Sequence, residues 1–290
     1  MAEMNLRKRL KDGKLLCAMG VYNAFTAKIV EKYGFECLYL TGYGVSAGNF
    51  AYPDIGLVTM TEMAETARRI TDRVSIPIIA DADTGYGDQV NIIRTVKEYE
   101  KAGVAAIQLE DQTWPKRCGH MEGKSVIPAD EMKPKIYAAV DSRQSEDTLI
   151  IARTDALALE GFDSAIERGN LFAEWGADVI FVEAPVTVEQ VRRIPRSVNA
   201  WSLINLAPRT PDCSVDEIEE MGFSIAIYPG ICISATYAAC IEELLKFKNT
   251  GRQGNLNFWT NNFDSFNDLL DLPRYRELEA VYEQTPDTTV

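Results

Sequence analysis

The sequence predicts a (β/α)8 barrel of the TIM type with one extra helix at its C-terminal end. Eight short apolar runs alternate with amphipathic helical patterns, and no break in composition separates them before about residue 250. The chain has 290 residues, and barrels of this kind commonly use about 250 residues as one domain. A doubly wound open sheet is the competing architecture, but no GxGxxG turn follows the first apolar run.

Each apolar run is rich in Ile, Val, Leu or Tyr and is too short for a helix, as expected of a fully buried parallel strand. The expected strands are 15–21, 37–41, 76–80, 105–109, 149–152, 179–182, 201–204 and 224–228. Between them, the clearest helical patterns open at or just after polar or capping residues. These expected helices are 61–71, 88–102, 128–140, 163–175 and 188–194.

The predicted barrel occupies residues 1–250, and residues 251–290 are expected to form a helical extension rather than an independent domain. This tail carries one further helical pattern, over 273–282, that a barrel does not need. Its leucines and Tyr275 require an apolar surface to pack on. We expect a partner subunit to provide that surface.

The charge balance excludes two classes of partner. Lys and Arg number 30 against 43 Asp and Glu, which gives a net charge of −13. Such a chain repels phosphate backbones and anionic membranes, so we expect neither nucleic acid nor a membrane as partner. No apolar stretch approaches the roughly 18 residues of a transmembrane helix, and the first residues lack the apolar core of a secretion signal. We therefore expect a cytoplasmic protein.

The six cysteines contain no CxxC pair and are too few for a disulfide framework in a chain of this length. They indicate a reducing compartment. Cys17, Cys37, Cys232 and Cys240 lie in apolar runs, and we expect them to be buried packing residues.

Carboxylates follow the expected strands at their C-terminal ends, which meet at one rim of a barrel. They are Asp81 and Asp83 after the third strand, Glu110 after the fourth, Asp155 after the fifth and Glu183 after the sixth. Anionic side chains converging there would repel one another unless a cation sat among them. The all-oxygen set favours Mg²⁺ or Mn²⁺ over Zn²⁺, with Asp81, Asp83 and Glu110 as ligands. Arg153, at a neighbouring strand end, suits capture of a substrate carboxylate.

A second constellation is the segment 115–124, PKRCGHMEGK, in the loop after the fourth strand. It holds His120, the only histidine of the chain, and places Cys118 among Lys116, Arg117 and Lys124. Nearby cations lower the pKa of a thiol and favour the thiolate. We expect a reactive acid/base cysteine on a mobile lid. The alternatives are a solvated basic loop and a Cys-His-Asp hydrolase triad, which would not require metal-binding carboxylates.

Five motifs go beyond composition: YLTGYG at 39–44, PDIG at 53–56, DADTGYG at 81–87, KRCGH at 116–120 and ARTDAL at 152–157. Together they resemble the isocitrate lyase/phosphoenolpyruvate mutase superfamily, in order over residues 10–245. Within it, the chain looks most similar to the short enzymes, namely methylisocitrate lyase, 2,3-dimethylmalate lyase and carboxyphosphonoenolpyruvate phosphonomutase.

The resemblance implies a bound Mg²⁺, an α-oxyacid ligand and a homotetramer whose C-terminal helices are exchanged between neighbours. By matching positions, it implies that Asp81 and Asp83 bind the metal, that Asp54 and Glu110 hold metal waters, and that Cys118 is the catalytic cysteine, with Gly119 and His120 beside it in the gate loop. It also implies that Thr41, Gly42 and Tyr43 cradle the substrate carboxylate and that Arg153 and Glu183 bind substrate. We add Asn205, at the end of the seventh strand, to the substrate-binding set.

The expected reaction is cleavage of the C2–C3 bond of a small branched 2-hydroxy di- or tricarboxylate, of the methylisocitrate or dimethylmalate type. This retro-aldol step gives a 2-oxoacid and a carboxylic acid, and Mg²⁺ would stabilise the oxyanion. Tyr39, or a metal-linked carboxylate, would take the hydroxyl proton, and Cys118 would protonate the departing carbon. The alternatives are a phosphonomutase and an oxaloacetate hydrolase. A barrel that only binds ligands would be expected to lack the metal carboxylates or Cys118.

Residues 203–211 depart from the pattern of the superfamily. Aligned without gaps on Thr210 and Pro211, Leu203 falls at the family's Asn, whereas a shift of two residues restores Asn205 and shortens the loop. In both alignments the family's acidic residue is missing, and 207–209 (APR) replaces glycines. We expect a changed specificity, in which Arg209 or Asn205 contacts the substrate group that the relatives contact with Asn and Glu. A cation there would favour a substrate with an extra anionic group.

Overall fold

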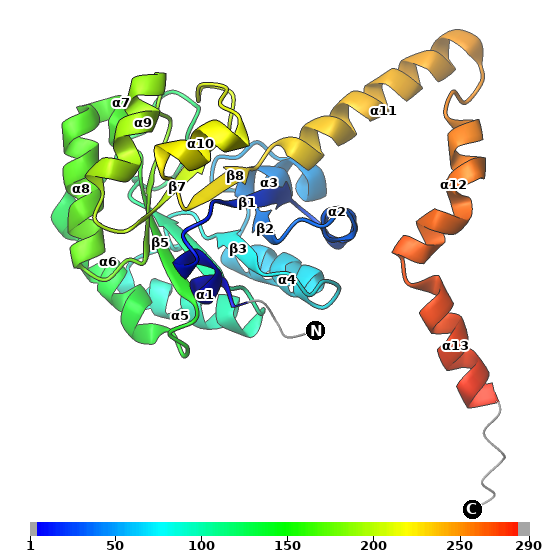
Figure 1. Ribbon diagram of the computed structural model, residues 1–290, viewed down its shortest axis with the longest axis horizontal. Helices are drawn as coiled ribbons and strands as arrows, with labels where there is room; N and C mark the ends of the chain where they lie inside the picture. Colours follow the sequence, from blue (N-terminus) through cyan, green and yellow to red (C-terminus); the bar gives the residue numbers. More distant parts are fainter. Residues whose placement is uncertain (1–4, 284–290) are drawn as a thin grey trace, which may run out of the picture. The chain divides into compact units, whose positions relative to one another are not determined.

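The computed structural model describes residues 5–283 and contains a closed barrel of eight parallel strands, in which each strand pairs with the next and β8 pairs with β1 (Figure 1). The strands are β1 (Leu16–Val21), β2 (Cys37–Leu40), β3 (Ile78–Asp81), β4 (Ala106–Glu110), β5 (Leu149–Thr154), β6 (Val179–Val182), β7 (Trp201–Asn205) and β8 (Ile225–Tyr228). Each overlaps one of the eight expected runs, so the predicted fold class is confirmed.

Helices surround the barrel. They are α1 (Leu6–Lys11), α2 (Ala24–Lys32), α3 (Gly42–Phe50), α4 (Met60–Thr71), α5 (Gln89–Lys101), α6 (Ala129–Ser142), α7 (Leu157–Glu160), α8 (Phe162–Glu174), α9 (Val188–Ser197) and α10 (Val215–Met221). The five expected helices between strands correspond to α4, α5, α6, α8 and α9. The start of α4 shows why sequence reasoning found it, because Thr59 and Glu62 form a capping box there.

Two layers of core follow from the alternation of side chains along the strands. On β7, Leu203 belongs to the cluster inside the barrel, whereas Ile204 belongs to the cluster between the strands and the helices. Leu6 and Leu10 of α1 join the inner cluster together with residues at the strand starts, such as Leu149. Helix α1 therefore closes the N-terminal end of the barrel, and the C-terminal ends of the strands remain for polar residues.

The chain divides into two compact units, and the first ends at Ile233, within α11 (Ile231–Thr250). The second unit, from Ser234, contains most of α11, together with α12 (Leu256–Leu269) and α13 (Leu272–Glu283). The pattern at 273–282 corresponds to α13, whereas α11 and α12 were not anticipated. No residue of these three helices is buried in the described chain.

The cysteine prediction is partly wrong. Cys37 is buried as expected, but Cys17 and Cys232 are half-buried and Cys240 is exposed. The apolar run that contains Cys240 forms part of the long helix α11 rather than a core strand. Among residues 5–283, no helix combines the length and the hydropathy that crossing a bilayer would require.

Candidate active site

The structure brings the predicted site residues together at the C-terminal end of the barrel. Asp81 ends β3, Glu110 ends β4, Arg153 lies near the end of β5, Glu183 directly follows β6, and Asn205 ends β7. All five side chains belong to residues that are less than 8% exposed. Five strands thus deliver charged or amide groups to one buried place, as the strand-end rule requires.

On one side of this place, three aspartates gather around a lysine. Lys116 Nζ forms ion pairs with Asp54 Oδ1 and, at 2.6 Å, with Asp83 Oδ1. Although burial disfavours its charge, Asp83 and Asp54 raise the pKa of Lys116 well above the ordinary value, so the side chain stays an ammonium ion. We call Asp54, Asp81, Asp83 and Lys116 the acidic half of the site.

Asp81 is held in place by a chain of hydrogen bonds that begins inside the barrel. Tyr39 Oη donates to Gln108 Oε1 (3.1 Å), and Gln108 Nε2 donates to Asp81 Oδ1 (3.2 Å). The backbone N–H of Asp83 donates to the same oxygen (3.1 Å). Burial raises the pKa of Tyr39 well above 10, so its phenol keeps its proton at neutral pH and orients Gln108.

The acidic half fits a hard divalent cation, although no three His, Cys, Asp or Glu side chains in residues 5–283 are arranged to hold a metal by themselves. Burial raises the pKa of Asp83 to about 7 and that of Glu110 well above its usual value, as expected where carboxylates crowd together in a site of low polarity. Glu110 Oε1 is buried without a hydrogen-bond partner in the described chain. Mg²⁺ accepts few protein oxygens and several waters, so Asp81 and Asp83 could bind it directly, with Asp54 and Glu110 behind water.

Helix α3 starts directly after β2 and points its N-terminus into the site. Thr41 is the N-cap, and its Oγ1 accepts a hydrogen bond from the N–H of Gly44 (3.2 Å). A Cβ at Gly42 would lie 2.8 Å from Asp81 Oδ2, so only glycine allows this close approach of backbone and carboxylate. Free N–H groups at a helix start bind anions, which suits the predicted carboxylate cradle of Thr41, Gly42 and Tyr43.

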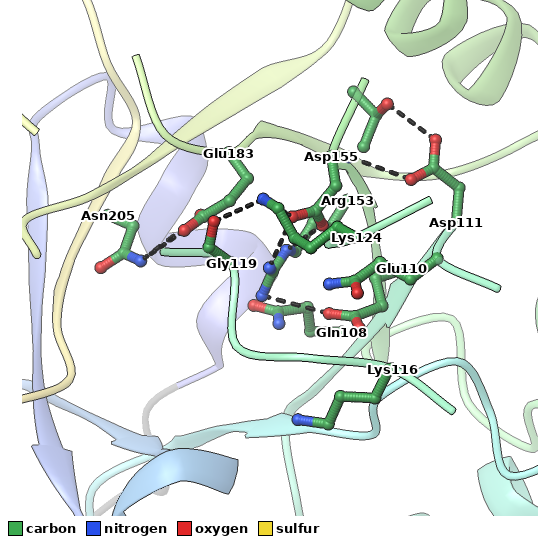
Figure 2. Close-up of polar contacts among 12 residues, drawn as sticks. Gln108, Glu110, Asp111, Lys116, Gly119, Lys124, Arg153, Asp155, Glu183 and Asn205 are labelled. Carbon is green, nitrogen blue, oxygen red and sulfur yellow. Dashed lines mark hydrogen bonds and ion pairs between the residues drawn. The ribbon is translucent and has the colours of Figure 1, made fainter. Parts of the chain in front are cut away.

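The opposite side of the site is built on an arginine. Arg153 Nε and Nη2 donate to the two carboxylate oxygens of Asp155 (2.8 and 3.1 Å), and Nη1 lies 3.1 Å from Glu110 Oε2 (Figure 2). Lys124 Nζ lies 2.7 Å from Asp155 Oδ1. We call Glu110, Lys124, Arg153 and Asp155 the arginine half of the site, in which two cations balance two carboxylates.

Glu183 lies between the loop and β7. Its Oε1 lies 2.9 Å from His120 Nε2, and Asn205 Nδ2 donates to the same oxygen (3.2 Å). His120 Nδ1 and Asn205 Oδ1 are buried and have no hydrogen-bond partner among the described residues. Two polar atoms thus remain available for a ligand, since buried groups in native proteins are usually paired.

The loop 115–124 carries Cys118 between the two halves. The backbone N–H of Cys118 donates to Asp54 O (3.1 Å), and a Cβ on Gly119 would collide with Arg153 and Glu183. Only a residue without a side chain can therefore bring this part of the loop so close to the barrel.

The prediction that neighbouring cations lower the pKa of Cys118 is wrong. Burial raises the pKa of this thiol. Lys116 and Lys124 do not offset that effect, since their ammonium groups form ion pairs with aspartates. A half-buried, protonated thiol is a proton donor rather than a nucleophile.

Sequence reasoning assigned no orienting role to the side chains that hold the predicted ones in place, although it noted Asp155, Lys116 and Lys124 as charged neighbours. Gln108, Lys116, Lys124 and Asp155 all contact predicted site residues. Strand periodicity offered a signal for Gln108 and Asp155, which lie two residues from Glu110 and Arg153 and so share their faces. Nothing local signalled Lys116, whose partner Asp54 is 62 positions away.

The structure places Leu203 and Asn205, the two residues on which the alignments of residues 203–211 differ. Leu203 lies inside the barrel core, and Asn205 is the residue that reaches Glu183. Asn205, rather than Leu203, therefore offers the polar group at this strand end. Arg209 is about half exposed, with Nη2 4.0 Å from the exposed Glu122 Oε1.

One open cleft lies apart from this convergence. It has a volume of about 820 Å³ and is lined by residues such as Met60, Trp114 and Lys135. None of the predicted site residues lines it. The chemistry is therefore assigned to the buried strand ends, where charged groups converge, rather than to the open cleft.

Comparison with known proteins identifies the family. The family model described as phosphoenolpyruvate phosphomutase matches residues 6–247. The 2,3-dimethylmalate lyase of Eubacterium barkeri is 44% identical over 279 residues, covering 96% of both chains. The chain belongs to the isocitrate lyase/phosphoenolpyruvate mutase superfamily. It is an enzyme of that superfamily, in the branch of short lyases and mutases that its motifs indicate.

Further relatives in this superfamily differ in reaction. The 2-methylisocitrate lyase of Aeropyrum pernix is 42% identical, covering 95% of this chain and 89% of the relative. The chloroplastic carboxyvinyl-carboxyphosphonate phosphorylmutase of Arabidopsis thaliana is 40% identical, covering 97% and 84%. The function is thereby established at the level of carbon–carbon lyases and mutases.

Solved structures agree with the fold. Oxaloacetate acetylhydrolase in complex with 3,3-difluorooxalacetate superposes with a TM-score of 0.91 at 33% identity, covering 97% of both chains. Phosphonopyruvate hydrolase in complex with oxalate and Mg²⁺ superposes with a TM-score of 0.88 at 29% identity, covering 97% of this chain and 98% of that one.

Proposed function

We propose that this chain is a Mg²⁺-dependent lyase that cleaves the C2–C3 bond of a small branched 2-hydroxy di- or tricarboxylate, giving a 2-oxoacid and a carboxylic acid. The observation that carries the proposal is the place of Cys118, a half-buried thiol on a loop that contacts Asp54 on one side and Arg153, through Gly119, on the other. Burial raises the pKa of this thiol, which suits a proton donor. Retro-aldol cleavage needs charge stabilisation at the hydroxyl and a proton donor at the departing carbon. The lyases among its relatives support the same reaction class.

Asp81 and Asp83 would hold the metal, with Asp54 and Glu110 binding its waters. When bound, Mg²⁺ would supply charge stabilisation for the oxyanion that develops on the substrate. The support lies in the all-oxygen donor set and in the buried, unpaired Glu110 Oε1. The Mg²⁺ bound to phosphonopyruvate hydrolase, a structural neighbour, points the same way.

The chain's own groups then divide the remaining tasks. The N-terminus of α3, from Thr41 to Tyr43, binds the C1 carboxylate, and Arg153 orients a second carboxylate. A carboxylate of the acidic half takes the hydroxyl proton, since the phenol of Tyr39 is occupied in its bond to Gln108. Cys118 protonates the departing carbon.

A second group of polar side chains completes the substrate site beside Arg153: His120, Glu183 and Asn205. The 2.9 Å contact with His120 Nε2 and the hydrogen bond from Asn205 fix the Glu183 carboxylate, and the unpaired His120 Nδ1 and Asn205 Oδ1 bind polar substrate groups. Gly119 carries the loop over Arg153 and keeps water from the carbanion-like product.

The test is a panel of 2,3-dimethylmalate, 2-methylisocitrate, oxaloacetate and phosphonopyruvate with purified chain and Mg²⁺. We expect a 2-oxoacid product, measured by reduction with lactate dehydrogenase, from one of the two hydroxy acids. Turnover should stop in excess EDTA and return with added Mg²⁺. Full activity in chelator would remove the metal from the proposal.

Two other reactions remain as second candidates, each supported by one likeness. The Arabidopsis phosphorylmutase favours a phosphonomutase, and the high TM-score with oxaloacetate acetylhydrolase favours hydrolysis of oxaloacetate. Phosphorus NMR of the phosphonopyruvate reaction and acetate detection in the oxaloacetate reaction separate these outcomes. If either of these products forms and no hydroxy acid is cleaved, the corresponding reaction would replace the lyase reaction as the proposed function.

We also propose that the chain is a homotetramer that exchanges its C-terminal helices. In the second unit, α12 exposes Leu256, Phe258, Trp259 and Phe263, and none of its residues is buried. A row of exposed aromatic residues indicates a protein interface. Light scattering on the full chain should give four chain masses, and Phe258→Asp should lower that mass, whereas Asn262→Asp on the same helix should not. An unchanged mass for Phe258→Asp would contradict the proposal.

A further inference from the structure

Lys124 is the most buried cation of the loop after Lys116, and none of the steps above uses it. Its side chain is 4% exposed. The ammonium donates to Asp155 Oδ1 at 2.7 Å and also to the backbone carbonyl of Gly119 (Figure 2). One group therefore ties the middle of the loop to the end of β5.

Asp155 is the point at which this tie meets the barrel. It is fully buried and accepts two hydrogen bonds from Arg153. Its own backbone N–H donates to Asp111 Oδ1 (2.9 Å), which fixes the main chain there. Although burial alone would raise it, Arg153 and Lys124 hold the pKa of Asp155 below its usual value. Asp155 is thus a rigid, ionised carboxylate.

Charge balance shows what Lys124 contributes. Arg153 is shared by two carboxylates, Glu110 and Asp155. Without the ammonium ion of Lys124, the ionised Asp155 would depend on Arg153 alone, which also pairs with Glu110, and an incoming substrate carboxylate would compete for the same guanidinium. Buried carboxylates left without enough cations are strongly unfavourable.

The loop geometry gives the second contribution. Gly119 packs against Arg153 and Glu183 so closely that a Cβ would collide with both. Lys124 holds the carbonyl of that same glycine. Cys118, the neighbour of Gly119, is therefore positioned through the contact between Lys124 and Asp155.

We propose that Lys124 is a positioning residue of the active site, whose ammonium ion clamps the Cys118 loop onto Asp155 and offsets the charge of that aspartate so that Arg153 can bind an anionic substrate. The kinetic part rests on the proposed lyase function, whereas the clamp does not. Lys124 touches neither the reacting carbon nor the metal carboxylates in this scheme.

The clamp is tested without turnover, by the rate at which iodoacetamide labels Cys118, resolved from the other cysteines by peptide mass spectrometry. We expect Lys124→Met to label about tenfold faster than wild type, because a lost buried ion pair lets the loop open more often. Lys124→Arg should restore a rate within about threefold of wild type, since guanidinium also pairs with carboxylate. Lys135→Met is the matched control, because Lys135 is a half-buried lysine of α6 whose ammonium donates to a backbone carbonyl, Gly87 O (3.0 Å).

A second pair of variants keeps the test valid if Lys124→Met folds poorly. Asp155→Asn removes the same ion pair from the barrel side and should also speed labelling. If Lys124 acts through Asp155, Cys118 in the double variant Lys124→Met/Asp155→Asn should be labelled at no more than about twice its rate in Asp155→Asn alone. Additive effects, or a wild-type rate in Lys124→Met, would overturn the clamp.

Kinetics then separate the two proposals. With the best substrate of the panel, Lys124→Met should raise KM about tenfold and lower kcat by less than about threefold, as expected when binding contacts are lost. Faster labelling with no turnover of any hydroxy acid by wild type would keep the clamp and overturn the lyase. Normal labelling together with hydroxy acid cleavage would keep the lyase and overturn the clamp.

Discussion

The two halves of the site differ in charge although they lie on neighbouring strands. The acidic half holds three aspartates and one ammonium ion, that of Lys116, which pairs with Asp54 and Asp83; this is a surplus of two negative charges when all are ionised. In the arginine half, Lys124 and Arg153 balance Glu110 and Asp155. One half therefore still attracts a cation, whereas in the other each carboxylate is already held by a cationic side chain.

The difference teaches how one barrel end can bind a metal and an anion at once. The carboxylates of the acidic half that lack a cationic partner attract Mg²⁺. The carboxylates that pair with Arg153 orient its guanidinium and leave the metal site its negative charge. Cys118 lies at the boundary, bonded through its N–H to Asp54 O and followed by Gly119 against Arg153. Changes in the two halves should accordingly fail in different ways.

The largest effect is expected in the acidic half. Asp81→Ala should lower Mg²⁺-dependent turnover by more than about 10³-fold, because it removes a direct ligand. Asp54→Ala should cost only about 10–100-fold, as is typical of groups that act behind the first ligands. Activity titrations with Mg²⁺ measure both. Equal losses would mean that the direct and water-mediated roles are wrongly divided.

The next largest effect on turnover is expected at Cys118, which lies between the two halves of the site. Cys118→Ser should lower kcat by about 10²–10³-fold, because a hydroxyl is a much weaker acid than a thiol. Binding of oxalate with Mg²⁺, measured by calorimetry, should stay within about threefold of wild type. Cys240→Ser, an exposed cysteine of α11, is the control. Turnover within twofold of wild type would make Cys118 a bystander.

Proton release on metal binding sharpens the contrast further. The folded pKa of Asp83 is raised from 3.8 to about 7, and a carboxyl must lose its proton to bind Mg²⁺. As the pH is raised toward 7, the affinity for Mg²⁺ should therefore increase about tenfold per pH unit. Above pH 7 the affinity should level off. Calorimetry in two buffers should find about one proton released at pH 6 and almost none at pH 8.5. A flat profile would place Asp83 outside the metal site.

The smallest effect is expected at the rim. Arg209 is about half exposed, and its partner Glu122 is 4.0 Å away and almost fully exposed. Exposed pairs contribute little, so Arg209→Ala should change KM by less than about twofold. A large rise in KM with kcat unchanged would instead support the substrate contact that its loop position suggested.

Sequence reasoning found what is local and periodic. The eight strands were predictable because each is a short apolar run buried on both faces, and the carboxylates were predictable because they end those strands. The start of α3 at Gly42 was missed, since a glycine pair after a strand resembles a turn. The roles of Lys116 and Lys124 were also missed, because their partners Asp54 and Asp155 are distant in sequence. Proximity along the chain gave the wrong sign for the pKa of Cys118.

The register of β7 has a consequence for how this loop can change length. Leu203 and Asn205 share the inward face of the strand, and Ile204 between them packs against the helices. A slip of two residues therefore exchanges one inward side chain for another, whereas a slip of one would point Ile204 at Glu183 and turn the amide into the outer layer. The alternation of side chains thus limits how this segment can change in length. An insertion or deletion of two residues before the loop can preserve a polar partner for Glu183, whereas one of a single residue must rebuild the end of the strand.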